Sequence, residues 1–452
     1  MTLLAINWAT VGIKAAQFVL SFSILVVLHE LGHFLPAKWF KCRVEKFYLF
    51  FNPGFSLAKK KIGETEWGLG WIPFGGYVKI SGMIDESMDK EQLKLPPQPY
   101  EFRAKKPWQR LIIMLGGVTV NVLLAIIIFI GITWVWGDEN LKPLETKYGL
   151  AVDSIGKSVG LKDGDIILKV DTSVVKDESS VTKKIILSEA KTITILRDGK
   201  DSVLQLPETL IRQLNKEKGL GFAELRFPCI VDTVDKKLPA YTAGLKKGDQ
   251  IIAVNNQPTQ FHHLVMQEIK KYKNKTVQIK IVRNADTLVL PIKTTDEGRI
   301  GFAPVANYSK LGFKIDTVTY TFAQSVPKGL SRCFVTLQNY LTGIKQLFSG
   351  KANPNESLGS VISIGSVFPG VWDWQSFWTL TAIFSIILAF MNVLPIPALD
   401  GGHALFTIVE MVTGRKPSDK FMEYAQTVGM VLLLGLMAYA LGLDFFRLFH
   451  KS

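Results

Sequence analysis

Long apolar runs alternate along this chain with stretches in which charged and apolar residues are mixed. Four of the runs are as long as the roughly 20 residues that a helix needs to cross a bilayer, and they cover residues 7–28, 111–136, 377–397 and 427–446. The second and third runs each contain an asparagine, Asn121 and Asn392. Runs of this length with aromatic residues at their ends are unusual for the core helices of soluble proteins. The pattern therefore predicts a multi-pass α-helical membrane protein with four transmembrane helices.

The first run has a second reading, as a cleaved signal peptide. It lacks a small-residue cleavage site, however, and a motif of chemically active residues stands at its end. Lys14, near its start, can extend its amine to the membrane interface. We therefore interpret the first run as a transmembrane helix.

Composition limits the class of protein but leaves its partner open. With 48% apolar residues the chain is too hydrophobic to be disordered, and three cysteines cannot form a disulfide framework. A net charge of +14 is compatible with nucleic acid or with an anionic membrane surface as the partner. The chain shows no basic stripe or nucleic-acid-binding motif beside this charge, so we expect no nucleic acid partner.

The distribution of charge predicts the orientation in the membrane. Residues 34–108 carry 13 Lys/Arg and 8 Asp/Glu, a net +5, whereas residues 138–373 carry 33 and 25, a net +8 over a much longer stretch. The positive-inside rule places the more densely basic loop in the cytoplasm. Four spans then place the long loop and both termini outside, which in a bacterium is the periplasm, and the protein in the inner membrane.

The long loop contains a sequence repeat. The segment 160–170 (GLKDGDIILKV) returns at 244–254 (GLKKGDQIIAV), an offset of 84 residues, and alternating apolar residues follow each copy. A Gly-Asp turn followed by an apolar strand resembles the PDZ domain, in the form common in bacterial proteases. The resemblance implies two mixed β/α domains that bind extended peptides, such as substrate C-termini, at a sheet edge. It is closer for the second copy, where Pro239, Ala240 and Ala243 precede the turn.

Candidate metal chemistry stands at the inner end of the first span, in the sequence His29-Glu-Leu-Gly-His33. Residues four apart lie on one face of a helix, so both imidazoles can reach one metal ion. Zinc binds neutral imidazole well, and Glu30 between them can take a proton from the attacking water. Placing two histidines and a glutamate at the end of a membrane span costs free energy, and such residues usually mark a functional site.

A catalytic zinc needs a third protein ligand, and the third span offers one. It ends in Asn392-Val-Leu-Pro395-Ile-Pro397-Ala-Leu-Asp400-Gly-Gly. The first and third spans cross in the same direction, so His33 and Asp400 should lie at the same membrane face. Asp400 is therefore the predicted third ligand, and His403 is a weaker alternative.

Together these motifs resemble the site-2 protease family of intramembrane zinc metalloproteases, in the branch typified by the bacterial regulator of sigma-E protease. The likeness rests on HELGH in the first span, NVLPIPALDGG in the third, the inserted PDZ-like repeats, and the segments 71–82 and 358–364. It implies that zinc is held by His29, His33 and Asp400, and that Glu30 is the catalytic base. It also implies a membrane-associated β-hairpin at 74–82 that holds an unwound substrate. The substrate-binding residues expected from it are Phe74, Gly75, Gly76, Tyr77, Val78, Asn121, Asn392, Pro395 and Pro397.

The expected activity is regulated intramembrane proteolysis of single-span membrane proteins, such as an anti-sigma factor or a remnant signal peptide, by a monomer. Residues 311–348 have the apolar spacing of an amphipathic helix, which could lie at the membrane interface or pack on the PDZ domains.

The predicted domains are transmembrane segments at 1–35, 109–137 and 374–403, a cytoplasmic loop at 36–108, PDZ domains at 138–215 and 216–305, an amphipathic linker at 306–373, and a loop with the fourth span at 404–452. The alternative function is a PDZ-bearing membrane scaffold or chaperone without catalysis, although such a protein has no use for Glu30.

Overall fold

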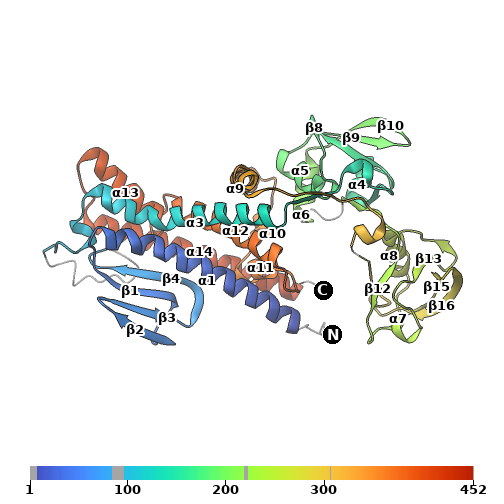
Figure 1. Cartoon of the computed structure of the whole chain (residues 1–452), viewed down its shortest axis with the longest axis horizontal. Coiled ribbons are helices and arrows are strands. Elements are labelled where there is room, and N and C mark those ends of the chain that lie inside the picture. Colours follow the sequence, from blue (N-terminus) through green and yellow to red (C-terminus); the bar gives the residue numbers. More distant parts are fainter. Residues whose placement is uncertain (1–7, 84–95, 218–221, 306, 451–452) are drawn as a thin grey trace. The chain divides into compact units, whose positions relative to one another are not determined.

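The computed structural model describes residues 8–83, 96–217, 222–305 and 307–450. It divides into two compact units (Figure 1), which we describe separately. The helical unit comprises Met1–Gly137, Thr319–Ile344 and Leu358–Ser452, and the β-rich unit comprises Asp138–Val318 and Lys345–Ser357. Residue 7, where the first span was expected to begin, and the side chain of Phe74 lie outside the described set.

The helical unit is built from long apolar helices. Four described helical segments are long and apolar enough to cross a membrane: Trp8–Trp39, Pro107–Val135, Trp374–Val393 and Lys420–Arg447. A helix closes its backbone hydrogen bonds internally, which is what a lipid environment requires. The described helices of this unit are α1 (Trp8–Trp39), η1 (Phe102–Ala104), α3 (Pro107–Val135), most of α9 (Phe322–Phe348), α11 (Val361–Ser366), α12 (Trp374–Val393), α13 (Asp400–Thr413) and α14 (Asp419–His450). The protein is a membrane protein that also carries separate β-sheets.

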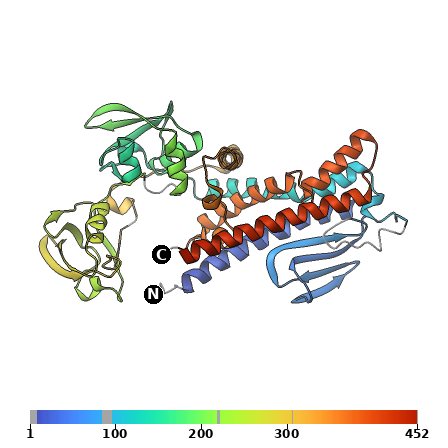
Figure 2. The same cartoon turned by 180° about the vertical axis from the view of Figure 1, so that it is seen from behind.

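Helices α1, α3 and α12 pack into a bundle whose contacts depend on small residues. A Cβ added to Gly116 would lie 1.9 Å from the carbonyl oxygen of Gly32, so the backbones of α3 and α1 touch at this point. Small residues allow such close approach between helices in lipid. Figures 1 and 2 show that α1 begins and α14 ends at the same end of the bundle, as an even number of membrane crossings requires.

A four-stranded sheet follows α1 and differs from the single hairpin expected at 74–82. Its strands lie in the order β2-β3-β1-β4, where β1 is parallel to β3 and antiparallel to β4. The strand bounds are β1 (Val44–Phe51), β2 (Ala58–Ile62), β3 (Thr65–Leu69) and β4 (Ile72–Ile80). The expected segment is therefore the edge strand of a sheet, and its pairing partner is β1, far along the chain. A sequence pattern does not reveal this non-local pairing.

The third apolar run is interrupted where the sequence predicted one span through residue 397. Helix α12 ends at Val393 and α13 begins at Asp400. Pro395 and Pro397 lack the N–H that a continuing helix would donate, and they disfavour helical conformation in the residue before them. Ala398 has a positive φ of 80°, a conformation that side chains other than glycine seldom adopt. The break places Asp400 at the first position of a new helix.

The β-rich unit contains two hydrophobic cores with the same sheet plan. One four-stranded sheet has the order β10-β9-β7-β8, and the other reads β16-β15-β13-β14 in the corresponding direction. Both carry a register shift at the same place, between Ile167 and Lys169 and between Ile251 and Ala253. The first core extends to Phe222, beyond the expected boundary at 215, because β11 pairs with β6.

The first part of the β-rich unit contains β5 (Asp138–Asn140), η2 (Pro143–Glu145), β6 (Leu150–Val152), α4 (Ser154–Ser158), β7 (Ile166–Val170), β8 (Ser173–Val174), η3 (Glu178–Ser180), α5 (Val181–Ser188), β9 (Thr192–Arg197), β10 (Lys200–Gln205), α6 (Thr209–Lys216) and β11 (Ala223–Leu225). The second part contains β12 (Val231–Val234), α7 (Pro239–Thr242), β13 (Gln250–Val254), β14 (Gln257–Pro258), α8 (His262–Lys270), β15 (Thr276–Arg283), β16 (Asp286–Lys293), β17 (Phe302–Pro304), η4 (Ser309–Leu311), β18 (Asp316–Val318) and α10 (Pro354–Ser357).

The repeated Gly-Asp turn holds a buried ion pair in each copy. Asp249 is 1% exposed, and Arg283 donates to both of its oxygens, each at 2.7 Å, and to the carbonyl of Gly244. Asp165 and Arg197 make the same contacts in the first copy. Burial would raise the pKa of Asp249, but hydrogen bonds from Arg283 and from the Lys246 backbone, with the charge of Arg283, lower that pKa overall. The repeat is therefore a structural lock that ties the turn to the sheet.

Removing this lock should destabilise the second core. We expect Asp249→Ala to lower its free energy of unfolding by about 3 kcal/mol, because the change leaves a partly buried arginine without its partner. Hydrogen exchange of the β13 and β15 amides in the full chain measures the change. The matched control is Asp232→Ala, since its ion pair with Lys247 is largely exposed and should contribute little to stability. Equal protection in both variants would contradict the lock.

Candidate metal centre and active site

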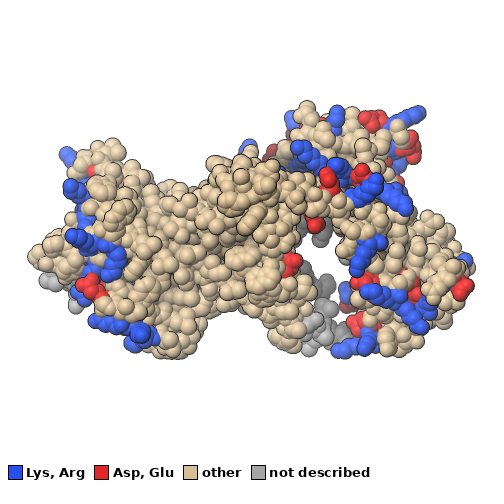
Figure 3. Space-filling view, in the orientation of Figure 1, with Lys and Arg blue, Asp and Glu red and all other residues tan. Residues whose placement is uncertain are grey.

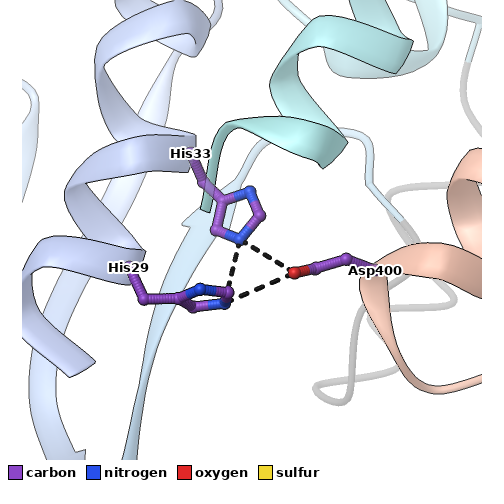
Figure 4. A group of neighbouring side chains, drawn as sticks. All are labelled: His29, His33 and Asp400. Atoms are coloured by element: carbon purple, nitrogen blue, oxygen red, sulfur yellow. Dashed lines mark hydrogen bonds and ion pairs between the residues drawn. The ribbon is translucent and has the colours of Figure 1, made fainter. Parts of the chain in front are cut away.

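Three side chains from distant parts of the chain converge on one point inside the helical unit. His29 and His33 project from the same face of α1, and Asp400 projects toward them from the first position of α13 (Figure 4). The Nε2 atoms of the two histidines are 3.3 Å apart, and each lies 3.3 Å from Oδ2 of Asp400. Among the described residues this is the group whose ligand atoms are placed to share a metal ion.

The triangle fits a zinc ion. A tetrahedral ion with bonds of about 2.0 Å holds its ligand atoms about 3.3 Å apart, which is the separation found here. Oδ2 of Asp400 is buried and accepts no hydrogen bond from the described residues, so it is an unsatisfied acceptor facing two imidazole nitrogens. Two histidines and a carboxylate form a donor set that zinc uses in hydrolytic enzymes, with a fourth position left open.

The neighbouring helix α3 holds the histidines in place. Nδ1 of His33 lies 2.8 Å from the carbonyl oxygen of Ile113, which can only accept, so this nitrogen donates and Nε2 keeps its lone pair for a metal. A Cβ added to Gly117 would lie 2.4 Å from Nε2 of His33 and 2.6 Å from Cε1 of His29. The absence of a side chain at Gly117 therefore makes room for both rings.

Glu30 lies beside the triangle, in a cavity of about 490 Å³ that also contains His29, His33 and Asp400. Gly76, Tyr77 and Val78 of β4 line the same cavity. A Cβ added to Gly76 would lie 3.6 Å from Cγ of Glu30, so the strand backbone passes close to the carboxylate. The cavity thus brings together a candidate base, a candidate metal site and the edge of a sheet.

The other predicted substrate-binding residues lie elsewhere. Gly75 and the backbone of Phe74 are in β4, and Gly75 does not line the cavity. Pro395 and Pro397 form the break between α12 and α13, where a Cβ added to Gly429 of α14 would lie 1.7 Å from the carbonyl oxygen of Pro397. These prolines shape the segment that carries Asp400.

The two predicted asparagines contact a histidine rather than the cavity. Nδ2 of Asn121 lies 3.1 Å from Nδ1 of His29, and Nδ2 of Asn392 lies 3.4 Å from Nε2 of the same ring. Neither asparagine lines the cavity. His403, the weaker ligand candidate, does line it but is not part of the triangle.

Sequence reasoning missed two supports of the site. Gly117 lies inside the second apolar run, where the pair Gly116-Gly117 is a signal for close helix packing. Arg110 and Glu410 form a buried ion pair at 2.5 Å that joins the start of α3 to α13, the helix that begins with Asp400. A pairing across 300 positions has no local signal.

Charge on the helical unit is confined to its ends on the face seen in Figure 3. Lys and Arg side chains gather around the end that carries the β1–β4 sheet, and a broad belt without charged side chains covers the helices beyond it. An apolar belt of this kind is the surface that lipid covers. The metal triangle therefore belongs to a bundle with a lipid-facing exterior.

Comparisons with known proteins agree with the geometry. Residues 17–436 match the family model described as peptidase family M50. The regulator of sigma-E protease RseP of Escherichia coli is 26% identical over 96% of this chain and 98% of its own length. Proteins of Treponema pallidum and Neisseria meningitidis whose names describe them as zinc metalloproteases are 26% and 27% identical, over 97% and 95% of this chain and over 100% and 98% of their own lengths.

Filling the space at Gly117 should weaken zinc binding. We expect Gly117→Ala to lower zinc affinity by at least about 10-fold, because its methyl group would overlap the rings of His29 and His33. Gly131→Ala in the same helix is the matched control, since an added Cβ there meets nothing within 4 Å. Zinc per protein chain, measured after dialysis against a graded chelator, separates the two. Equal zinc retention would show that α3 does not confine the rings.

Proposed function

This chain belongs to peptidase family M50, the site-2 family of intramembrane zinc metalloproteases, and from that premise we propose which residues carry the reaction. His29, His33 and Asp400 hold the zinc ion, and Glu30 is the general base. The observation that carries this assignment is the 3.3 Å triangle of ligand atoms beside Glu30 in one cavity.

The protein's own groups then have separate tasks in peptide hydrolysis. When bound, zinc polarises the scissile carbonyl and lowers the pKa of water. Glu30 takes a proton from the attacking water and delivers it to the leaving nitrogen, so the carboxylate is restored in each turnover. No covalent intermediate with the chain is required.

We further propose that β4 holds the substrate. A helical substrate hides its amides in its own hydrogen bonds, and it must unwind before attack. Unpaired backbone in lipid is costly, so the unwound segment needs new partners. As the edge strand of its sheet, β4 has one side that no other described strand pairs with, and Gly76, Tyr77 and Val78 place it along the cavity that contains Glu30. An added strand there would present its carbonyls to the site.

The substrates of regulator of sigma-E type proteases are membrane proteins. For this chain we propose a single-span anti-sigma factor or a remnant signal peptide. We also propose that the two bodies of the β-rich unit are PDZ domains that filter substrates by size or bind their C-termini. Support comes from the repeated sheet order and the repeated Asp-Arg lock.

The proposed location is a bacterial inner membrane, with the β-rich unit and both termini in the periplasm. The basic residues beside the β1–β4 sheet support a cytoplasmic position for that end of the helical unit. The exposed apolar side chains of α9, among them Phe334 (72% exposed) and Phe348 (90%), favour a membrane-facing role for this helix.

Glu30→Gln should separate metal binding from catalysis. We expect the variant to bind zinc like the wild type while cleaving a model transmembrane substrate at least about 100-fold more slowly, because the amide cannot take the proton. Glu64→Gln is the matched control, since this residue is exposed and should leave the rate unchanged. Zinc content and cleavage are measured on the same preparations. A wild type without zinc would overturn the metal assignment and favour a scaffold, whereas an active Glu30→Gln would overturn only the role of Glu30 as the base.

Topology should follow the charge distribution. In cells whose chain lacks its native cysteines, a membrane-impermeant maleimide should label Lys273→Cys in the β-rich unit and leave Lys60→Cys in β2 unlabelled until the membrane is opened. Both positions are exposed in the structure. The reverse labelling would contradict the proposed orientation.

A further inference from the structure

Asn121 is placed behind the metal triangle, where no substrate can reach it. Its side chain is fully buried, and it does not line the cavity that contains Glu30. Its amide lies against Nδ1 of His29, on the side of the ring that faces away from Asp400. Oδ1 of Asn121 is buried and has no hydrogen-bond partner among the described residues. The residue therefore acts on His29 rather than on a substrate.

The amide orientation decides whether His29 can bind a metal. If Nδ2 of Asn121 donates to Nδ1, the neutral ring carries its proton on Nε2, and that nitrogen has no lone pair for a metal. Nitrogen and oxygen of an amide are told apart only by their hydrogen bonds. Turning the amide over places Oδ1 against Nδ1, which gives the unsatisfied oxygen a donor and leaves the lone pair on Nε2.

His33 provides an internal precedent for this arrangement. Its Nδ1 lies 2.8 Å from the carbonyl oxygen of Ile113, and a carbonyl can only accept. The Nδ1–H of His33 is thereby fixed, and Nε2 is free for the metal. Metal-binding histidines generally donate their other N–H to an oxygen that sets the tautomer and the ring orientation. At His29 the described residue in the corresponding place is Asn121.

The helices around Asn121 make it a rigid support. Ser385 of α12 donates to the backbone oxygen of Asn121 at 2.7 Å, and the hydroxyls of Ser21 and Thr381 meet at 2.8 Å between α1 and α12. Hydrogen bonds of this kind join helices in lipid. The position of the amide relative to His29 is therefore set by three helices.

We propose that Asn121 is a positioning residue that accepts the Nδ1–H of His29 through Oδ1 and so directs the Nε2 lone pair of that ring to zinc. This inference rests on the proposed role of His29 as a zinc ligand. It replaces the substrate-binding role expected from the sequence. Removal of such a support typically costs 10–100-fold in metal affinity.

An acceptor-only variant tests the direction of the hydrogen bond. Aspartate keeps the shape of asparagine and can accept but, when ionised, cannot donate, whereas leucine keeps the volume and does neither. We expect Asn121→Leu and Asn121→Ala to bind zinc about 10–100-fold more weakly than the wild type in competition with a chelator, and Asn121→Asp to restore binding. The visible spectrum of the Co²⁺-loaded chain should stay tetrahedral in the aspartate variant and change in the other two.

Controls separate this inference from the proposed function. Thr133→Val makes a buried polar position of α3 apolar far from the rings and should bind zinc like the wild type. If neither the wild type nor Thr133→Val binds zinc, the proposed function fails. If the wild type binds zinc and Asn121→Leu binds it equally well, only the role of Asn121 is overturned. The same holds if Asn121→Asp binds zinc as weakly as Asn121→Leu does. The melting temperatures of the zinc-free variants show whether a loss of affinity reflects unfolding.

Discussion

The geometry of the proposed metal site depends on the contact between α1 and α3. The two helix backbones touch there because the facing residues are glycines. Gly32 stands between the two histidines of α1, and Gly116 and Gly117 face it from α3. The contact brings the carbonyl oxygen of Ile113 and the amide of Asn121 within hydrogen-bond distance of the rings. Polar rings are tolerated among apolar helices only when such partners satisfy them.

A second set of contacts brings Asp400, the proposed third ligand, to this point. The chain must leave its helix after Val393 so that Asp400 can turn inward, and two prolines enforce the break. Glycine at 429 lets α14 lie directly on that segment, and the Arg110–Glu410 pair fixes the helix that follows it. The proposed metal site is thus held together by close packing of backbone on backbone and by one buried ion pair between α3 and α13.

Much of this could be predicted from the sequence, because the signals are local or periodic. The apolar runs predicted membrane helices, and the spacing of His29 and His33 predicted that both rings face one metal ion. The direction of the spans predicted that Asp400 lies beside them. The supports could not be predicted, because they depend on which residues of α3 face α1. For the same reason the contacts of Asn121 and Asn392 with His29 could not be foreseen from the sequence. The hairpin was expected as a local unit, whereas β4 pairs with its neighbour β1, from which β2 and β3 separate it in the sequence.

The position of Asp400 at a helix start favours an acidic side chain there. The aligned peptide dipoles of α13 place a partial positive charge at its start, and Asp400 is the first residue of that helix. A negative side chain gains from this field, whereas a neutral one does not. The histidines lie within α1, away from either end, where the field of the helix is weak. The proposed ligand set therefore follows the electrostatics of the two helices, with a carboxylate at a helix start and two imidazoles along a helix shaft.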